Sequence, residues 1–245
     1  MNYILSPNIL KFANKAAKIP GIKYLLKPFY YSYKKYLSHK RTQAFLKNGH
    51  RILKEFDRVM NENGFHYSVF AGTLLGAIRE KSFLKHDDDI DIMLFYEEYS
   101  SRLHKVLSDA GFRLVHRFCI DNGEKGLEET YEKFNIPIDI FFIHSDSVFQ
   151  TYQCDFQKCE GCFSFKESME KYGYVIARRN EFPVSKHTHR ILIDDIEVNA
   201  IDNAEEWLAC RYGIDYMLPN PNFRDDGSNP RMNIWKDAHA VFTDF

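Results

Sequence analysis

The first 54 residues contain neither aspartate nor glutamate, and this absence sets the segment apart from the rest of the chain. Twelve Lys and Arg residues lie there. The remainder therefore holds 21 of the 33 basic residues and all 34 acidic residues, a difference of −13. The net charge of −1 thus conceals a basic N-terminal segment joined to an acidic body. Such a segment favours contact with an anionic surface.

Long apolar runs and cysteines are also scarce. No stretch is apolar over the length needed to cross a bilayer, and the N-terminus does not have the form of a signal peptide. The five cysteines are an odd number, which argues for a reducing compartment rather than a secreted disulfide framework. We therefore expect a cytoplasmic protein, and the 44% hydrophobic and 16% aromatic content predicts a sizeable folded core.

Residues 1–40 are expected to form a basic N-terminal arm, ahead of a domain that spans residues 41–245. Aromatic residues are interleaved with the lysines of this arm: Phe12, Tyr24, Phe29, Tyr30, Tyr31, Tyr33 and Tyr36. Basic and interfacial aromatic residues together are typical of segments that lie on an anionic membrane. Packing on the acidic body of the same protein is the alternative. We expect no nucleic-acid binding, because nothing resembles a recognised nucleic-acid module.

An acidic run lies near the middle of the chain, at Asp87-Asp88-Asp89-Ile90-Asp91, and Ile92-Met93-Leu94-Phe95 follows it. Alternation from Asp89 onward predicts a strand, on which Asp89 and Asp91 share one face about 7 Å apart along the backbone. Two such carboxylates can converge on a divalent cation, and their hard oxygen atoms suit Mg²⁺ or Mn²⁺. A solvated acidic loop is the alternative, but it does not require interleaved apolar residues.

A short strand-like run at 67–70 precedes Gly72 and Thr73, which open a predicted helix. Backbone N–H groups and a hydroxyl at a helix N-terminus are suited to phosphate. Gly72 and Thr73 are therefore candidate substrate-binding residues. Arg79 and Lys81 lie between this cradle and the acidic run, where they could neutralise donor phosphates.

Residues 72–92 resemble the signature of the LicD-type phosphotransferases, a family that includes fukutin and fukutin-related proteins. The matching residues are Gly72-Thr73-Leu74-Leu75-Gly76-Ala77-Ile78-Arg79, Phe83 and Asp87-Asp88-Asp89-Ile90-Asp91-Ile92, with further agreement at 138–141 and 212–219. The resemblance implies a nucleotidyltransferase-like fold. It also implies metal-dependent transfer of a phosphorylated alcohol, such as phosphocholine, from a CDP-activated donor to a glycan or lipid-linked glycan of surface polysaccharide or lipopolysaccharide. The family usually has Pro-Trp where this chain has Lys85-His86, so the donor and acceptor stay open.

Asp139 is the third candidate metal ligand and catalytic acid, beside Asp89 and Asp91. It is a lone charge in the apolar run Ile138-Asp139-Ile140, and such a charge is costly unless it is paired or bound to metal. A salt-bridged structural aspartate is the alternative, and the family resemblance favours the metal. Asp87 is a candidate general base for the acceptor hydroxyl.

The remaining pattern predicts an α+β domain of α/β-like character, with a nucleotidyltransferase-like mixed sheet flanked by helices and a basic N-terminal helical arm. Strands are expected at 67–70, 112–120, 128–134 and 136–143, and a hairpin at 190–198. Helices are expected at 41–63, which Gly64 ends, at 97–110, and from a capping box at 202–205 to Gly213.

Three alternatives stay open. Cys154, Cys159 and Cys162 could bind zinc with His187 or His189, although free thiols are favoured because only three cysteines cluster. Asp87, Asp89, Asp91 and Glu98 have calcium-loop spacing, but Ile92 stands where that loop needs glycine. A metal-dependent glycosyltransferase with an Asp-x-Asp motif, or an inactive glycan-binding relative, is the third alternative.

Overall fold

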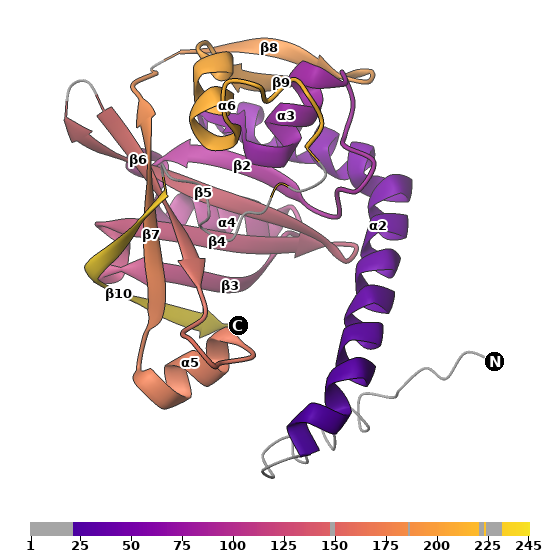
Figure 1. The fold of residues 1–245 in the computed structure, drawn as a ribbon. Coiled ribbons are helices and arrows are strands. Elements are labelled where there is room, and N and C mark those ends of the chain that lie inside the picture. The colour runs from indigo at the N-terminus through magenta and orange to yellow at the C-terminus, as the bar shows by residue number, and fades with distance from the viewer. Residues whose placement is uncertain (1–21, 148–149, 186, 221–222, 224–231) are drawn as a thin grey trace.

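The computed structural model describes residues 22–147, 150–185, 187–220, 223 and 232–245. Its centre is a mixed eight-stranded sheet in the order β1-β2-β5-β4-β3-β10-β7-β6 (Figure 1). The strands are β1 (Tyr67–Val69), β2 (Ile90–Phe95), β3 (Arg113–Ile120), β4 (Gly126–Lys133), β5 (Ile136–Ser147), β6 (Gln150–Gln157), β7 (Val175–Pro183) and β10 (Met232–Asp244). A mixed sheet flanked by helices confirms the predicted α+β class.

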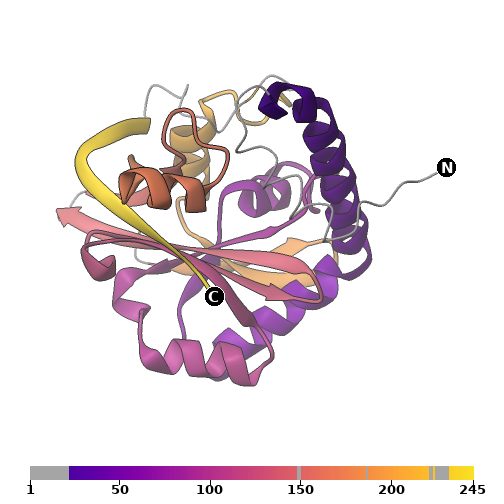
Figure 2. The same cartoon turned by 90° about the horizontal axis from the view of Figure 1, so that it is seen from below.

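The sheet closes on itself through its two longest strands. β5 pairs with β2 and β4 and, toward its C-terminal end, with β6, while β10 pairs with both β3 and β7. Strands β5, β4, β3, β10, β7 and β6 therefore form a ring, and the curvature of β10 is plain from below (Figure 2). Closure gives the sheet a concave side, enclosed between β4, β5 and β6.

Helices cover both sides of the sheet. They are α2 (Ile22–Glu62), α3 (Ala71–Arg79), α4 (Ser101–Asp109), α5 (Phe165–Tyr172) and α6 (Ala204–Tyr212), with short 3₁₀ turns η1 (Tyr96–Glu98) and η2 (Asp121–Gly123). α4 and the C-terminal half of α2 lie on one side, and α5 and α6 lie on the other (Figure 2). A separate hairpin of β8 (Thr188–Ile193) and β9 (Ile196–Ile201) confirms the turn predicted at 190–198. Over the described part of the chain, no helix is both long and apolar enough to cross a membrane.

α2 joins the expected arm to the body. It runs without interruption across residue 40, and among those of its side chains that the structure describes, the buried ones lie between Phe45 and Met60. The N-terminal half extends past the sheet (Figure 1). The predicted end of the helix before Gly64 is confirmed, because Gly64 has φ +66°, which glycine adopts at little cost. Residues 1–21 of the arm lie outside the described residues, and the division at residue 40 stays a prediction.

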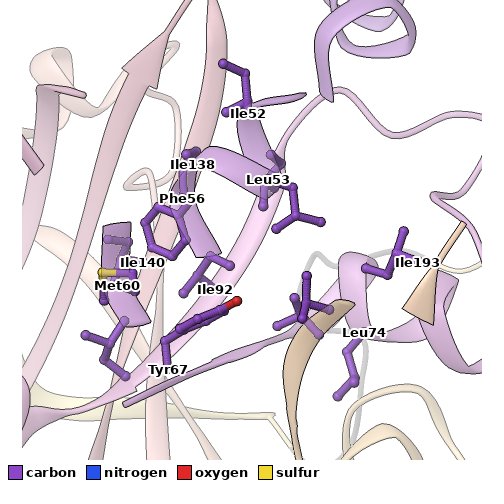
Figure 3. Packing of buried hydrophobic residues seen from close by; sticks show 14 of the residues in the cluster. Ile52, Leu53, Phe56, Met60, Tyr67, Leu74, Ile92, Ile138, Ile140 and Ile193 are labelled. Atoms are coloured by element: carbon purple, nitrogen blue, oxygen red, sulfur yellow. The ribbon is translucent and has the colours of Figure 1, made fainter. Parts of the chain in front are cut away.

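The main core lies between α2 and the sheet, and its alternation explains the acidic strand. Ile90, Ile92 and Leu94 of β2 are fully buried against this core. Ile138 and Ile140 of the neighbouring strand β5 join them, and Figure 3 shows the packing of Ile92, Ile138 and Ile140 with Phe56 of α2. Since side chains alternate along a strand, Asp91 and Asp139 must point to the opposite, concave side.

Some elements differ from the sequence prediction. β6, β7, β10 and α5 were not predicted. The helix expected from a capping box at 202–205 instead begins at Ala204, with Asn203 as N-cap and no side-chain cap bond. The box is absent because the Asp202 carboxylate lies 3.2 Å from His189 Nδ1, which draws it toward β8.

Gly76 of α3 allows the backbone of residues 82–84 to pass close to the helix. A Cβ at this position would lie 2.5 Å from the Ser82 carbonyl oxygen and 3.2 Å from the Leu84 backbone nitrogen. Because backbone atoms cannot move aside cheaply, we expect Gly76→Ala to lower the free energy of unfolding by about 1–3 kcal/mol. Chemical denaturation measures this change.

Gly49→Ala in α2 is the matched comparison. There the added Cβ would lie 3.2 Å from the Phe45 ring, a side chain that can shift, and alanine favours the helix by about 0.5–1 kcal/mol. Its stability should stay within about 1 kcal/mol of wild type. Equal stability of both variants would contradict the close approach at Gly76.

Candidate active site

A cavity of about 340 Å³ opens on the concave side of the sheet. Its lining comes from the start of α3, the end of α6 and strands β2, β4, β5 and β6. The lining residues are Ala71, Gly72, Asp89, Asp91, Glu128, Asp139, Phe141, Asp155, Phe156, Gln157, Arg211 and Tyr212. Four of the eight residues expected in the site are therefore in the cavity wall: Gly72, Asp89, Asp91 and Asp139.

The structure brings the three candidate metal ligands together. β2 and β5 are parallel neighbours with Asp91 directly opposite Asp139, and Asp89 lies two residues before Asp91 on the same side. One carboxylate oxygen from each of the three residues lies within 4.8 Å of the others. This spacing lets a single cation contact all three carboxylates.

Burial and mutual repulsion raise the pKa values of the three carboxylates. Burial, and secondarily the charge of Asp139, raises the pKa of Asp91 to about 7. Burial and the charge of Asp89 raise the pKa of Asp139 to about 7. The pKa of Asp89 is also raised well above its ordinary value, first by burial and then by Asp91. Hard oxygen donors that repel one another when ionised fit Mg²⁺ or Mn²⁺, which would replace the protons.

These pKa shifts predict how stability depends on pH. A raised pKa in the folded state means that folding favours the protonated acid. The resulting stabilisation is complete below the unfolded pKa near 4 and is lost as the pH rises toward 7. The Tm of the metal-free protein should therefore fall more steeply between pH 5 and 8 than the Tm of Asp139→Asn. Parallel Tm curves for the two proteins, measured by differential scanning fluorimetry in EDTA, would contradict this.

Gly72 and Thr73 hold the acidic strand in place. The Gly72 N–H donates to Asp91 Oδ2 at 2.8 Å, and the Asp91 N–H donates to Thr73 Oγ1 at 2.9 Å. A Cβ on Gly72 would lie 3.0 Å from Asp91 Oδ2, so a side chain at this position would crowd the carboxylate. These two groups of the expected phosphate cradle therefore bind Asp91, and their contact with phosphate stays a prediction.

Arg79, Lys81 and Asp87 do not line the cavity. The Arg79 guanidinium donates to the Tyr216 carbonyl and to Glu80 Oε1, and Lys81 is exposed. Asp87 Oδ2 accepts from the Leu84 N–H at 3.0 Å and thereby shapes the loop before β2. Burial raises the pKa of Asp87 to about 6.

Three charged groups of the cavity were not predicted: Glu128, Asp155 and Arg211. Arg211 of α6 is the only cationic side chain of the lining among the described residues, and its side chain is 5% exposed. Its Nη1 lies 3.6 Å from Asp155 Oδ2, and its charge lowers the pKa values of Asp91 and Glu128. Burial nevertheless raises the pKa of Glu128 well above its ordinary value.

The zinc and calcium alternatives gain no support from the described residues. The only group that brings three potential ligand atoms together there is the aspartate cluster, and all five cysteines are free. The calcium loop is wrong, because Ile90–Phe95 continue as strand β2 and Glu98 Oε1 contacts His66 instead.

The segment that contains the aspartate cluster is similar to known proteins. Residues 64–171 match the family model described as LicD/FKTN/FKRP, nucleotidyltransferase domain. Ribitol-5-phosphate transferase FKTN is 29% identical in Macaca fascicularis and 28% in Homo sapiens, over 105 residues, 42% of this chain and 22% of each relative. Lipopolysaccharide cholinephosphotransferase LicD of Haemophilus influenzae is 44% identical over 48 residues, 20% of this chain and 18% of the relative.

These matches confirm the expected LicD-type family, related to fukutin, for the segment from β1 to α5. The chain spans only 18% to 22% of the length of these curated relatives. The matched segment contains the aspartate cluster, Glu128 and Asp155, whereas Arg211 and Tyr212 lie beyond it. The α6 wall of the cavity therefore belongs to the part of the chain outside the matched domain.

Proposed function

We propose that this protein is a metal-dependent phosphotransferase that moves a phosphorylated alcohol from a CDP-activated donor to a glycan hydroxyl. The observation that carries the proposal is the cluster of Asp89, Asp91 and Asp139 in the wall of a cavity, within a LicD-type nucleotidyltransferase domain. The names of the relatives, a ribitol-5-phosphate transferase and a lipopolysaccharide cholinephosphotransferase, support the reaction class and a surface-glycan acceptor.

Asp89, Asp91 and Asp139 would hold the cation on the β2–β5 side of the cavity. Bound Mg²⁺ or Mn²⁺ would supply a Lewis acid for the donor diphosphate. The Gly72 N–H and the Thr73 hydroxyl hold Asp91 before any ligand arrives, so this carboxylate needs little rearrangement to bind.

Arg211 takes the charge-neutralising role that the sequence suggested for Arg79. It lines the same cavity as the aspartates and its charge acts on Asp91, and a guanidinium can bind two phosphate oxygens at once. We propose that it binds the donor diphosphate and offsets the charge that develops as CMP leaves.

Glu128 is the carboxylate we propose as general base, in place of Asp87. It lines the cavity from β4, beside Asp139 on β5, whereas Asp87 is held by Leu84 outside the lining. In its ionised form, a carboxylate with a raised pKa is a stronger base toward a hydroxyl proton.

A donor panel tests the proposal. The full chain would be incubated with CDP-choline, CDP-ribitol, CDP-glycerol and CDP-ethanolamine, together with glycan acceptors, with Mg²⁺ or with EDTA. We expect CMP release from one donor in Mg²⁺ and none in EDTA. Equal release in EDTA, or release from no donor in the panel, would count against the proposal.

We further propose that the basic N-terminal arm brings the enzyme to an anionic membrane, at the inner face of the cytoplasmic membrane, where lipid-linked glycans are available. The full chain should bind vesicles containing anionic lipid and dissociate as salt rises, because screening weakens charge attraction. A chain that begins at Arg41 keeps the buried segment of α2 from Phe45 onward. It should lose vesicle binding and keep activity on a soluble acceptor. Equal sedimentation of both proteins with vesicles would contradict the membrane role.

A further inference from the structure

A row of polar side chains crosses the sheet directly behind Asp139. Asp139 on β5 is the register partner of Thr130 on β4, and Thr130 is the register partner of His116 on β3. Asp244 on β10 faces His116 from the other side. Register partners point to the same face of a sheet, so these side chains lie in one row that ends at the aspartate cluster.

Two hydrogen bonds connect this row to the candidate metal ligand. The Thr130 hydroxyl donates to Asp139 Oδ1 at 2.5 Å, and His116 Nε2 lies 2.8 Å from the same hydroxyl oxygen. A threonine hydroxyl has one proton, which is given to the carboxylate here. When Asp139 is ionised, as a metal ligand is, the hydrogen between His116 Nε2 and Thr130 Oγ1 comes from the imidazole tautomer that is protonated at Nε2.

A β-bulge brings His116 into the row. The β3–β4 register shifts between Leu114 and His116, so Val115 is an extra residue on β3. In a strand without the bulge, Val115 would be the residue opposite Thr130. The bulge is held from the other side, because the Phe245 N–H donates to the Val115 carbonyl at 2.8 Å. Bulges redirect side chains, and this one supplies a hydrogen-bond donor where the regular strand would supply valine.

The imidazole is held in this orientation by aromatic neighbours. Its ring centroid lies 5.4 Å from that of Phe118, edge to face, and 5.7 Å from that of Phe242. The half-buried ring therefore has little freedom to turn away from Thr130.

We propose that Thr130 and His116 are positioning residues for Asp139. Through Thr130, His116 holds Asp139 Oδ1 and turns Oδ2 toward the cation shared with Asp89 and Asp91. The proposal rests on the proposed metal site. Hydrogen-bonded partners behind a metal ligand typically contribute about 10–100-fold to metal affinity, which sets the expected size of the effect.

Mn²⁺ titration of the full chain, followed by the loss of the free-Mn²⁺ EPR signal, tests the proposal without an activity assay. Thr130→Val removes the hydroxyl at nearly constant volume and should raise the Kd for Mn²⁺ about 10-fold or more. Thr130→Ser restores the hydroxyl and should restore the affinity. His116→Gln keeps an N–H donor and should bind more tightly than His116→Leu. The histidine pair gives an independent reading if Thr130→Val does not fold.

Thr151→Val is the matched control. Thr151 is also a buried strand threonine, and its hydroxyl donates to the Phe182 carbonyl rather than to a carboxylate of the cluster. Its Mn²⁺ affinity should equal that of wild type. Wild-type affinity in both Thr130→Val and His116→Leu would overturn the positioning role while leaving the metal site intact. Absence of Mn²⁺ binding by the wild-type protein would overturn the metal site itself and the positioning role with it.

Discussion

Asp89→Asn and Asp91→Asn are expected to abolish transferase activity while the fold persists. Each substitution removes an anionic ligand from a cluster whose oxygens lie within 4.8 Å of one another. A metal contributes several kcal/mol to the stabilisation of transition-state charge. The loss of kcat should therefore be on the order of 10³-fold, since about 1.4 kcal/mol corresponds to a factor of ten.

The same variants should be more stable than wild type when no metal is bound. Asparagine keeps an oxygen that can accept the Gly72 N–H, and it removes a buried charge that Asp139 repels. The Tm of metal-free Asp91→Asn at pH 8 should exceed that of metal-free wild type, and Mg²⁺ should no longer raise it. Near-normal turnover in Mg²⁺ by either variant would contradict the assignment of the cluster.

Arg211→Met is expected to cost about 10–100-fold in kcat/KM for the donor. The estimate follows from a hydrogen bond to a charged group, which contributes about 1.5–3 kcal/mol. The donor-free variant should bind Mn²⁺ more tightly than wild type, because Arg211 places a positive charge near Asp91 and Glu128. A lower kcat/KM for the donor together with tighter Mn²⁺ binding would not arise from partial unfolding, which would weaken both.

Lys81→Met is the matched control for Arg211→Met. Lys81 was also a candidate phosphate ligand from the sequence, but it is exposed and outside the cavity lining. Its removal deletes one positive charge without touching the cavity, so kcat/KM should stay within about threefold of wild type. A larger loss for Lys81→Met than for Arg211→Met would reverse the roles given to these two residues.

The aspartate cluster could be predicted because its evidence is local. Asp89 and Asp91 are separated by one residue in an alternating strand, and Asp139 is a lone charge between Ile138 and Ile140. The parallel pairing of β2 with β5 places Asp91 opposite Asp139, and this pairing cannot be predicted from the local sequence pattern. Family resemblance supplied that step.

Arg211 and Glu128 could not be predicted because their role depends on chain closure. Arg211 lies 120 residues beyond Asp91 in the sequence, between Cys210 and Tyr212 in a short helix, and nothing local marks it. Glu128 and Glu129 are adjacent in the sequence, and only the formation of the sheet places their side chains on opposite faces. Glu129 points to the other face, where Arg117 Nε donates to it at 2.7 Å, while Glu128 lines the cavity.

Two of the strands that were not predicted, β6 and β7, share one cause. β6 and β7 carry polar residues toward the concave side, where Gln153, Asp155 and Asn180 hydrogen-bond to one another. This network breaks the apolar alternation by which a strand is recognised in sequence. The interior of a binding cavity is therefore the part of the fold that hydrophobic periodicity describes least well.

The most direct measurement asks which bond of the donor breaks. A phosphotransferase directs the acceptor hydroxyl to phosphorus, whereas an Asp-x-Asp glycosyltransferase directs it to a sugar carbon. With the full chain, Mg²⁺, the CDP-alcohol selected by the donor panel and its acceptor, we expect CMP as the nucleotide product. Phosphorus NMR should show a new diester signal on the glycan. Release of intact CDP, with a glycan product that contains no phosphorus, would contradict the proposed function.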